Sequence, residues 1–563
     1  MNIKQVIQSD IEKSIKKAGL VSPTPVQVSY PRDSSLGDYS VNWPLQVAED
    51  INQPAIEIAK KIQRGLEKSE VYGTPEVAEP GFINFHLSPE FLGKHLQLVL
   101  AEGEKFGSSN QGKGQVAVIE YSSPNIAKPM NIGHLRNTNI GQSLVNIFNF
   151  NSYQTISDNH IGDWGTQFGK LLYAYKQWGR DQENIDIKTL LELYVRFHDE
   201  AASKPEMEEA ARAEFRQLEQ GDQENRQLWE KFRAISLVEF ERTYLELGAK
   251  FDFNLGESSY ERDLTRIVDE AIKLRVAKKD PDGSVVIPLE GIPPFLILKS
   301  DGATLYGTRD LATAKYRIEK FHPNQVLYVI ASEQALYLTQ LFSALKKLGW
   351  GEGIKWVHVS YGLTKLPQGK MSTRSGDLVT AEEVIDEAKK LAAAVIKDKD
   401  RSKAPDQKLI AEVAVGAIKW NDLKISREAE VVFDWKQIFS IEGNTGPYLQ
   451  YTYARTQNIL SRSSELAVAT DSSLLKEEIE LAILRKLVRF PEQIEAAAQS
   501  YHPHMIAQFA FELSQEFSRF YEQCPVLTAP ESLKQARLAL VKAVGNTLKT
   551  SLSLLGISAP SRL

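Results

Sequence analysis

The chain has 563 residues, more than one hydrophobic core usually serves, so about three or four domains are expected. Hydrophobic residues make up 42% and charged residues 25%, as in ordinary globular proteins, which argues against disordered, collagen-like and coiled-coil classes. No apolar run approaches the ~18–20 residues of a membrane span, and the amphipathic start, MNIKQVIQSDIEKSIKKAGL, lacks the apolar core of a signal peptide. We therefore expect a cytoplasmic protein without a membrane segment.

Cysteine content and net charge narrow the function classes further. The one cysteine, Cys524, cannot form an intramolecular disulfide or a cysteine-rich zinc cluster. The net charge of −6 gives no global sign of nucleic-acid binding, which usually accompanies clustered Lys and Arg. If the chain binds RNA, local patches must carry that binding.

Composition shifts divide the chain into three predicted domains. Residues 1–112 read as a small α+β unit that ends in the turn-rich linker EKFGSSNQGKGQ. Residues 113–400 alternate helical patterns with the strand candidates VAVIEY, NSYQTISDNH, FLILKS, VLYVIA and WVHVSY, which predicts an α/β, Rossmann-like, doubly wound parallel sheet. A charged, mainly helical insertion is expected over 171–249, and its charge run is read as a solvated face. Residues 401–563 predict an all-α bundle.

A loop between the first strand of the α/β domain and its helix has the character of a nucleotide site. Backbone N–H groups and the dipole at the start of a helix favour phosphate. In the loop EYSSPNIAKPMNIGHLRNT, Gly133 allows close backbone approach, His134 offers a donor and Lys128 supplies a compact positive charge. The residues alone leave a plainer alternative open, because a strand, loop and helix with one Gly and one His is a common arrangement.

The same loop resembles the HIGH signature of class I aminoacyl-tRNA synthetases in its arginine-specific form, over SSPNIAKPMNIGHLRNT. NHIGDWGTQFGKL, SDGATLYGTRDLATAKYR, GKMSTRSGDLVT and NTGPYLQYTYAR resemble further arginyl-tRNA synthetase segments in family order, the third as the KMSK motif and the fourth as the start of the anticodon-binding bundle. PGFINFHLSPEFL resembles the N-terminal extension of the family, whose domain contacts tRNA. The resemblance therefore covers nearly the whole chain.

The resemblance implies an arginine-tRNA ligase. Such an enzyme activates L-arginine with ATP to arginyl-adenylate, releases diphosphate, and transfers arginine to the 3′ end of tRNA(Arg) with release of AMP. It also implies that activation requires tRNA and that Mg²⁺ accompanies ATP. We expect no protein-bound structural metal, because the sequence shows no metal-ligand spacing, and we take a monomer as the default.

The resemblance also assigns site residues. The catalytic set is Lys128, Asn131, His134 and Lys370. The ATP-binding set is Lys128, Gly133, His134, Lys370, Met371 and Ser372. A guanidinium favours planar carboxylate partners, and the arginine-binding set is Glu120, Ser123, Asn125, Tyr306, Asp310, Gln340 and His160, the last two being the weaker candidates. The tRNA-binding set is Tyr448, Tyr451 and Arg455.

Spacing alone allows other readings of two of these sets. Tyr306 and Asp310 are four residues apart in a helical pattern, which is equally typical of an exposed pair on one helix face. The aromatic stripe that begins at Tyr448 has the spacing of a helix face that packs in a core.

Three positions depart from the family pattern. Asn131 replaces the first His of HIGH; it can donate a hydrogen bond but cannot carry positive charge toward the phosphates. Thr373 replaces the last Lys of KMSK, and the family appears to compensate with the lysine that matches Lys128. Leu563 ends the chain where Met is usual, so its contribution near the anticodon is in question.

Two alternative functions remain at this point. The first is another class I synthetase, since these enzymes share the sheet and the two signatures; a cysteine-specific enzyme is disfavoured by the single Cys. The second is a synthetase-like protein that binds tRNA or a partner without catalysis, which Asn131 and Thr373 motivate. Retention of Lys128, His134 and Lys370 favours a working enzyme.

Overall fold

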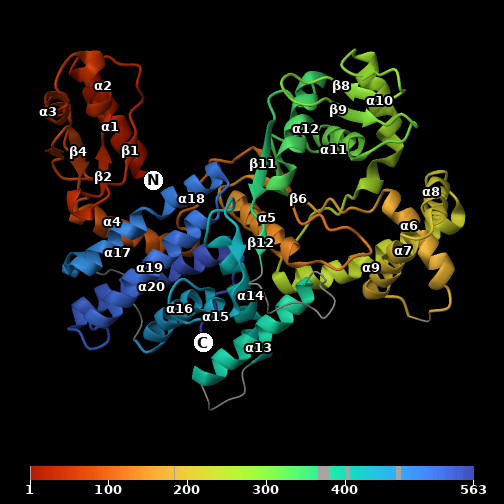
Figure 1. The fold of residues 1–563 in the computed structure, drawn as a ribbon. Helices are drawn as coiled ribbons and strands as arrows, with labels where there is room; N and C mark the ends of the chain where they lie inside the picture. The colour runs from red at the N-terminus through yellow and green to blue at the C-terminus, as the bar shows by residue number, and fades with distance from the viewer. Residues whose placement is uncertain (1, 183, 366–378, 400–405, 464–470) are drawn as a thin grey trace.

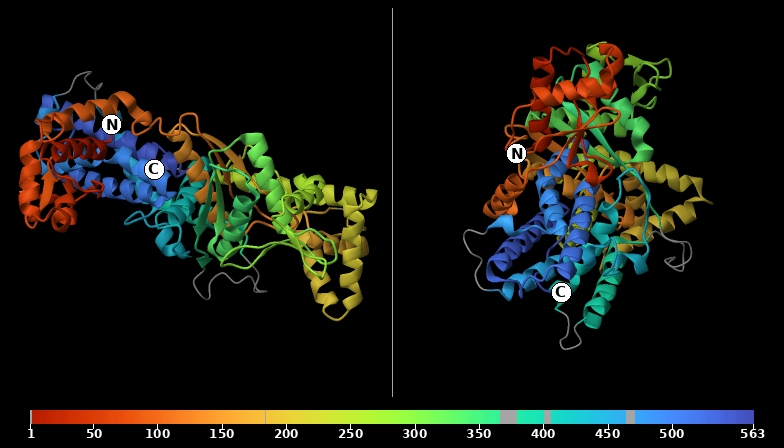
Figure 2. Two further views of the ribbon diagram at one scale, coloured as in Figure 1. Left: turned by 90° about the horizontal axis from the view of Figure 1, so that it is seen from above. Right: turned by 90° about the vertical axis from the view of Figure 1, so that its left-hand side faces the viewer.

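The computed structural model describes residues 2–182, 184–365, 379–399, 406–463 and 471–563. Its parts form an elongated molecule (Figures 1 and 2), with the N-terminal domain at one end and the helical insertion at the other. The α/β domain lies between them, beside the C-terminal helices. Within the described ranges, no helix is both long and apolar enough to cross a membrane.

The N-terminal domain packs three helices on an antiparallel sheet of order β1-β2-β4-β3. Its elements are α1 (Ile3–Lys17), β1 (Val28–Ser29), β2 (Tyr39–Val41), α2 (Trp43–Ile51), α3 (Ala55–Gly65), β3 (Glu76–Ala78) and β4 (Phe82–Phe85). Helix α1 buries Ile3, Ile7 and Ile11 on one face, which is the period of a helix with a single apolar stripe. Helix α4 (Pro89–Glu102) then leads out of the domain, and the side chain of Ser88 caps its first turn.

A buried histidine on α4 makes the stability depend on pH. The His95 ring lies 5.6 Å from that of Phe91 and 5.4 Å from that of Phe106, and burial lowers the pKa of His95 to about 4. Unfolded histidine titrates near ~6.5, so below that pH the unfolded chain takes up a proton that the folded chain refuses. The histidine therefore costs stability as pH falls from 6.5 toward 4.

We expect His95→Leu to remove this acid sensitivity. Urea unfolding at pH 7 and pH 5 should show a loss of stability on acidification that is smaller in the variant by about 2 kcal/mol, from ~1.4 kcal/mol per pH unit. His86→Leu is the control, because that side chain is 45% exposed. Equal acid losses in the two variants would contradict the assignment.

The α/β domain is built on a parallel sheet of order β11-β10-β5-β6. Its strands are β5 (Val116–Glu120), β6 (Gln154–Asp158), β10 (Gln325–Ala331) and β11 (Lys355–Tyr361). Helix α5 (Ile132–Phe150) connects β5 to β6, while α11 (Tyr306–Phe321) and α12 (Ala335–Leu348) flank β10. Strand β6 lies on one side of β5 and β10 on the other, so the strand order reverses at β5. Ligands of such sheets bind at the carboxyl ends of the strands beside this reversal. The predicted fold class is confirmed.

One predicted strand lies in a different sheet. FLILKS forms β9 (Phe295–Leu298), but β9 pairs antiparallel with β8 (Val285–Ile287), which pairs with β7 (Lys278–Lys279). Its assignment to the parallel sheet was wrong. Antiparallel neighbours can be joined by a short loop, whereas a parallel partner requires a crossover of about a dozen residues or more, and β8 ends only a few residues before β9. Helix α10 (Leu264–Lys273) covers this small sheet.

The insertion consists of four helices, α6 (Thr166–Trp178), α7 (Ile187–Ala201), α8 (Pro205–Glu219) and α9 (Gln223–Leu247). The charge run on α8 is only partly a solvated face, because Glu208 and Glu214 accept hydrogen bonds from Lys170 and Lys176 of α6 at 2.8 and 2.7 Å. Helix α8 itself buries Met207, Ala211, Phe215 and Leu218.

The C-terminal part is helical, as predicted. It contains α14 (Gln407–Leu423), α15 (Trp435–Ile438), α16 (Gly446–Ser461), α17 (Glu478–Val488), α18 (Phe490–Ser500), α19 (His504–Gln523) and α20 (Glu531–Leu554), preceded by α13 (Ala381–Lys399). A short parallel ladder of β12 (Thr364–Lys365) and β13 (Val431–Val432) ties these helices to the end of β11. The boundaries at 112 and 400 stay predictions.

Candidate functional site

The loop after β5 has unusual backbone geometry. Ser122, Ser123 and Ala127 have φ of 69°, 48° and 63°, in the left-handed region that non-glycine residues seldom adopt. Surrounding groups hold these conformations: Asn137 Oδ1 accepts from the Ser122 N–H at 2.7 Å, and Asn159 Oδ1 accepts from the Ser123 N–H at 3.1 Å. The buried Ser123 Oγ has no partner among the described residues. Strain of this kind is concentrated at functional sites.

The same loop is joined to the segment after β6. The N–H of Gly162 donates to the Pro124 carbonyl at 3.0 Å, and the N–H of Ile126 donates to the Gly162 carbonyl at 3.2 Å. A Cβ at Gly162 would lie 2.0 Å from Asn125 Oδ1, so a larger residue there would displace the Asn125 side chain. Asn125 is itself exposed, where it is available to a ligand.

Asn131 forms the N-cap of α5. Its Oδ1 accepts from the N–H of Gly133 at 3.0 Å and of His134 at 3.3 Å, and the His134 ring accepts in return from the Asn131 N–H. The motif departure alone predicts that Asn131 is a weakened catalytic donor. A reciprocal capping box gives it a second task, which is to fix the first turn of the helix and the ring of His134.

The capping box determines which nitrogen of His134 carries the proton. Nδ1 accepts from the Asn131 N–H at 3.0 Å, so the proton of the neutral ring is on Nε2, which is left to donate to a ligand. Burial lowers the pKa of His134 to about 4, so the ring is neutral at pH 7. His134 can therefore offer a phosphate a hydrogen bond but not a charge.

We expect Asn131→Ala and Asn131→Asp to separate the two tasks of this residue. Alanine loses the cap and should lower the free energy of unfolding by about 1 kcal/mol. Aspartate keeps a cap oxygen and suits the helix dipole, so its stability should be unchanged, while its negative charge should slow arginine activation at least about tenfold by repelling phosphate. Urea unfolding and pyrophosphate exchange measure the two effects; an equally stable alanine variant would contradict the capping role.

Lys128 lies next to this helix start. Its Nζ is 4.5 Å from the centre of the Tyr194 ring on α7, and partial burial lowers its pKa. Among the described residues it forms no ion pair with a carboxylate. Its charge is therefore available to an anion.

The second signature motif lies mostly outside the described residues, and this includes Lys370, Met371, Ser372 and Thr373. The next described residue is Val379, which lies beside the first signature motif. The Val379 carbonyl accepts from the Ile132 N–H at 3.3 Å, and the N–H of Ala381 donates to the Met130 carbonyl at 2.8 Å. The end of the KMST segment is thus anchored beside the start of α5.

An ionic cluster closes the carboxyl ends of β5 and β6. The buried guanidinium of Arg317, from α11, lies 2.6 Å from a carboxylate oxygen of Glu120 and 2.7 Å from one of Asp158. Glu120 ends β5, as predicted, but it already has a cationic partner within the protein. A bound guanidinium would share this carboxylate with Arg317.

Asp310 is the acidic group of the cluster that is best placed for a ligand. It lies seven residues before Arg317 on α11, hence on the same face. The hydroxyl of Tyr337, from α12, donates to Asp310 Oδ2, and His160 Nε2 lies 3.9 Å from Oδ1. The buried His160 Nε2 has no hydrogen-bond partner among the described residues. Burial raises the pKa of Asp310 and outweighs the lowering effect of His160.

The other arginine-site candidates are placed unequally. Tyr306 begins α11 as predicted; it is 56% exposed, and its ring meets that of Tyr337 edge-on at 4.9 Å. The side chain of Gln340 instead donates to the carbonyls of Pro293 and Pro294 at 2.9 and 3.3 Å, and so supports the loop before β9.

The charges of the ionic cluster favour an additional cation. Among the described residues, the one permanent cation paired with Glu120 and Asp158 is Arg317. Burial lowers the pKa of His160, but the negative field of Glu120 and Asp310 outweighs it and raises that pKa. Beside the cluster, burial raises the pKa of Glu257 to about 7, although Arg309 lies 3.3 Å away. A buried site with more carboxylates than cations favours the binding of a cationic ligand.

Sequence reasoning missed Arg317, Tyr337 and Glu257. Arg317 had a signal, because it ends the segment SDGATLYGTRDLATAKYR and follows Asp310 by two helical turns. Tyr337 and Glu257 reach the pocket from separate elements, and nothing in their local sequence marks them.

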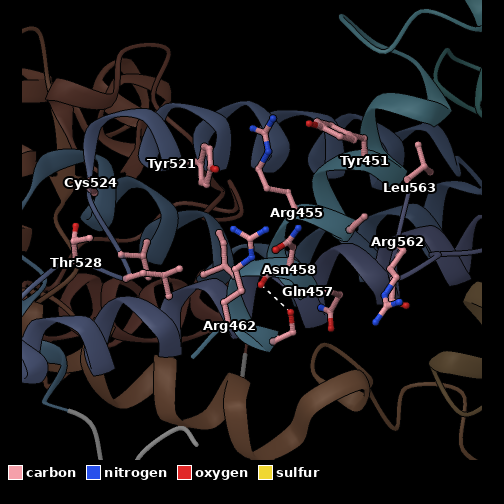
Figure 3. Close-up of a pocket in the computed structure, with 16 residues that line it drawn as sticks. Tyr451, Arg455, Gln457, Asn458, Arg462, Tyr521, Cys524, Thr528, Arg562 and Leu563 are labelled. Carbon is pink, nitrogen blue, oxygen red and sulfur yellow. Dashed lines mark hydrogen bonds between the residues drawn. The ribbon is translucent and has the colours of Figure 1, made fainter. Parts of the chain in front are cut away.

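A cavity of about 970 Å³ lies in the C-terminal bundle (Figure 3). Tyr451 and Arg455 of α16 line it together with Arg462, Tyr521, Arg562 and Leu563. The Arg455 guanidinium lies 4.9 Å from the ring of Tyr451 and 4.7 Å from that of Tyr521. Tyr448 points elsewhere: its hydroxyl donates to the Ser514 carbonyl at 3.3 Å, on α19. The three predicted tRNA residues are therefore divided between cavity and core.

Comparison with known proteins is consistent along the chain. The family model for the N-terminal domain of arginyl-tRNA synthetase matches residues 5–87, that for the catalytic domain of class I (R) tRNA synthetases matches 95–435, and that for the DALR anticodon binding domain matches 449–563.

Relatives and solved structures match over full length. An arginine–tRNA ligase of Clostridium perfringens is 39% identical over 95% of this chain and 96% of its own, and one of Levilactobacillus brevis is 38% identical over 100% of both. The arginyl-tRNA synthetase structure of Thermus thermophilus superposes with a TM-score of 0.86 at 25% identity over 100% of both chains; that of Plasmodium falciparum gives 0.85 at 25%, over 100% and 99%. With three family models in order and relatives matched end to end, the chain belongs to the arginyl-tRNA synthetase family.

Proposed function

We propose that this arginine–tRNA ligase binds the guanidinium of its substrate in the acidic pocket around Asp310. The observation that carries the proposal is the surplus of buried carboxylates among the described residues. Of these, Asp310 accepts a hydrogen bond from Tyr337 and lies 3.9 Å from His160 Nε2, but has no permanent cation of its own among the described groups. Glu120 would take a second side of the guanidinium and Tyr306 would cover it. Ser123 and Asn125 would receive the α-amino and carboxylate groups.

ATP would bind across the start of α5. Lys128 supplies charge and His134 supplies a neutral Nε2–H donor, while Gly133 keeps the backbone open to the nucleotide. From the second signature we propose Lys370, Met371 and Ser372 as further phosphate and nucleotide contacts. Asn131 contributes by capping. Its side-chain Nδ2 donates to no partner among the described residues and so remains available to a ligand.

The reaction proceeds in two displacements. A carboxylate oxygen of arginine attacks the α-phosphorus of ATP, the bond to the bridging oxygen breaks, and diphosphate leaves. A terminal ribose hydroxyl of tRNA then attacks the adenylate carbonyl, loses its proton and expels AMP. Neither step requires a covalent enzyme intermediate. Positioning of the reactants and stabilisation of phosphate charge by Lys128 and His134 would supply the catalysis.

Mg²⁺ is proposed to enter with ATP as its counterion, held chiefly by phosphate oxygens. Within the described ranges there is no group of three or more His, Cys, Asp and Glu side chains that could hold a metal ion. We further propose that the enzyme acts as a monomer in the cytoplasm, in keeping with its single buried cysteine.

We propose that tRNA is bound through the C-terminal cavity by Tyr451 and Arg455. Tyr448 would support them by holding α16 against α19 through its hydrogen bond to the Ser514 carbonyl. Arg455→Gln should raise the KM for tRNA about 5- to 20-fold, because it removes one phosphate contact and the stacked guanidinium. The kcat at saturating tRNA should change little. Aminoacylation kinetics measure both quantities.

Arg519→Gln is the matched control, since it removes the same charge from an exposed position on α19 that does not line the cavity. If both variants raise the KM alike, a diffuse electrostatic effect rather than the cavity is responsible. An unchanged KM in Arg455→Gln would contradict the assignment.

A further inference from the structure

The helical insertion contacts the side chain of the proposed catalytic lysine. Lys128 belongs to the loop after β5, but its Nζ lies 4.5 Å from the centre of the Tyr194 ring on α7. The ring of His198, one turn later on α7, meets that of Tyr194 at 4.7 Å and restricts its tilt. The lysine is therefore placed by an element far from it in sequence.

The insertion also holds the backbone that carries this lysine. The N–H of Ala127, whose φ is 63°, donates to Ser236 Oγ on α9 at 2.8 Å. Ser236 is fully buried, and its hydroxyl donates in turn to the Phe232 carbonyl at 2.7 Å. A strained turn with a buried donor keeps its conformation only if the donor is satisfied. Side chain and backbone are thus fixed by two separate helices.

An aromatic partner suits a lysine that must bind phosphate. A carboxylate at the same place would neutralise the ammonium and compete with the phosphate oxygens. A ring face attracts the cation without supplying an opposing charge or accepting its proton. His198 adds no competing charge, because burial and the nearby charges of Lys170 and Lys128 lower the pKa of its ring.

We propose that the insertion positions Lys128 for catalysis, with Tyr194 orienting its ammonium and Ser236 fixing its backbone turn. Tyr194 and Ser236 are positioning residues that act on ATP phosphates through Lys128. The inference rests on the proposed role of Lys128 in arginine activation. It assigns the charged helical segment a function in the chemical step.

The test compares Tyr194 variants in pyrophosphate exchange at saturating tRNA. Tyr194→Leu and Tyr194→Met remove the ring, and each should lower kcat about 5- to 30-fold while the KM for arginine changes by less than about twofold. Tyr194→Phe keeps the ring and should restore the rate to within about twofold. Unfolding temperatures show that the variants remain folded, and the better-folded of the Leu and Met variants is used for the cycle below.

Trp178→Leu is the control for a general effect on the insertion. Trp178 makes the same kind of contact with α7, where the Arg196 guanidinium lies 4.3 Å from its ring, and its described ring contacts are with Arg196 and Tyr173 rather than with the Lys128 loop. Its exchange rate should equal that of the wild type. A loss like that of Tyr194→Leu would show that any disturbance of α7 slows the enzyme and would overturn the inference.

A double-mutant cycle separates this inference from the proposed function. If Tyr194 acts through Lys128, its removal in a Lys128→Met background should cost no further activity. Multiplicative losses would show that Tyr194 acts elsewhere and would overturn the inference, while the role of Lys128 stands. If Lys128→Met itself leaves the rate unchanged, the proposed role of Lys128 fails, and the inference fails with it.

Discussion

Asp310→Ala should lower kcat/KM for arginine about 10²- to 5 × 10³-fold, while the KM for ATP changes less than about threefold. The variant leaves a guanidinium in a buried pocket without its main counter-charge, and breaking one side of such a pair costs about 3–5 kcal/mol. The ATP contacts at the start of α5 belong to another loop, so they should be unaffected. Pyrophosphate exchange with each substrate varied in turn measures the two effects.

Asp310→Asn distinguishes charge from shape at this site. Asparagine keeps an acceptor for Tyr337, so the variant should keep its fold and still lose most of the arginine affinity. Asp269→Ala is the control for losing a carboxylate, because Asp269 is exposed on α10. Equal losses for arginine and ATP in Asp310→Ala would contradict the assignment of the pocket.

Lys128→Met should lower kcat for pyrophosphate exchange about 10²- to 10³-fold, the range seen when one preorganised donor to developing charge is removed. Because Thr373 replaces the last lysine of KMSK, Lys128 should carry more of the phosphate charge than a lysine in a full motif. The equilibrium affinity for arginine should stay within about twofold. Single-turnover exchange and arginine titration measure the two quantities.

The control for Lys128 is a lysine of the insertion that does not face the site. Lys188, on α7, lies 3.2 Å from Glu382 and is largely exposed. Lys188→Met should leave the exchange rate within about twofold of wild type. A small loss in Lys128→Met, of the size of the control, would show that the charge is supplied elsewhere.

The parallel sheet could be predicted from sequence because its strands are buried runs of β-branched residues between helical patterns. VAVIEY and VLYVIA became neighbouring strands for that reason. The same reasoning failed for FLILKS, since an apolar run reports burial and not its partner strand. Only the short connection to β8 shows that an antiparallel partner was nearer.

The acidic pocket could be predicted only in part. Asp310 and Glu120 lie in segments that resemble the family, so the sequence predicted both as arginine-binding carboxylates. Tyr337 comes from α12, and its contact with Asp310 depends on how two helices pack, which no local pattern records. Asn131 shows a different limit. Its departure from the motif predicted weaker catalysis, whereas the structure also gives the residue a capping role.

The aromatic stripe on α16 shows why spacing could not decide between core and site. Tyr448 and Tyr451 are three residues apart and share one broad face, but one contacts α19 and the other lines the cavity. The boundary between buried and open surface crosses that face. A helical period gives the direction of a side chain relative to its own helix, not what lies opposite it.

Arginine activation by this chain can be measured by pyrophosphate exchange into ATP with each amino acid in turn, with and without tRNA. We predict exchange with arginine in the presence of tRNA and none above background with the other amino acids, including lysine, whose ammonium cannot present the fork of a guanidinium to Asp310 and Glu120. Exchange with another amino acid, or no exchange with arginine when tRNA is present, would contradict the account.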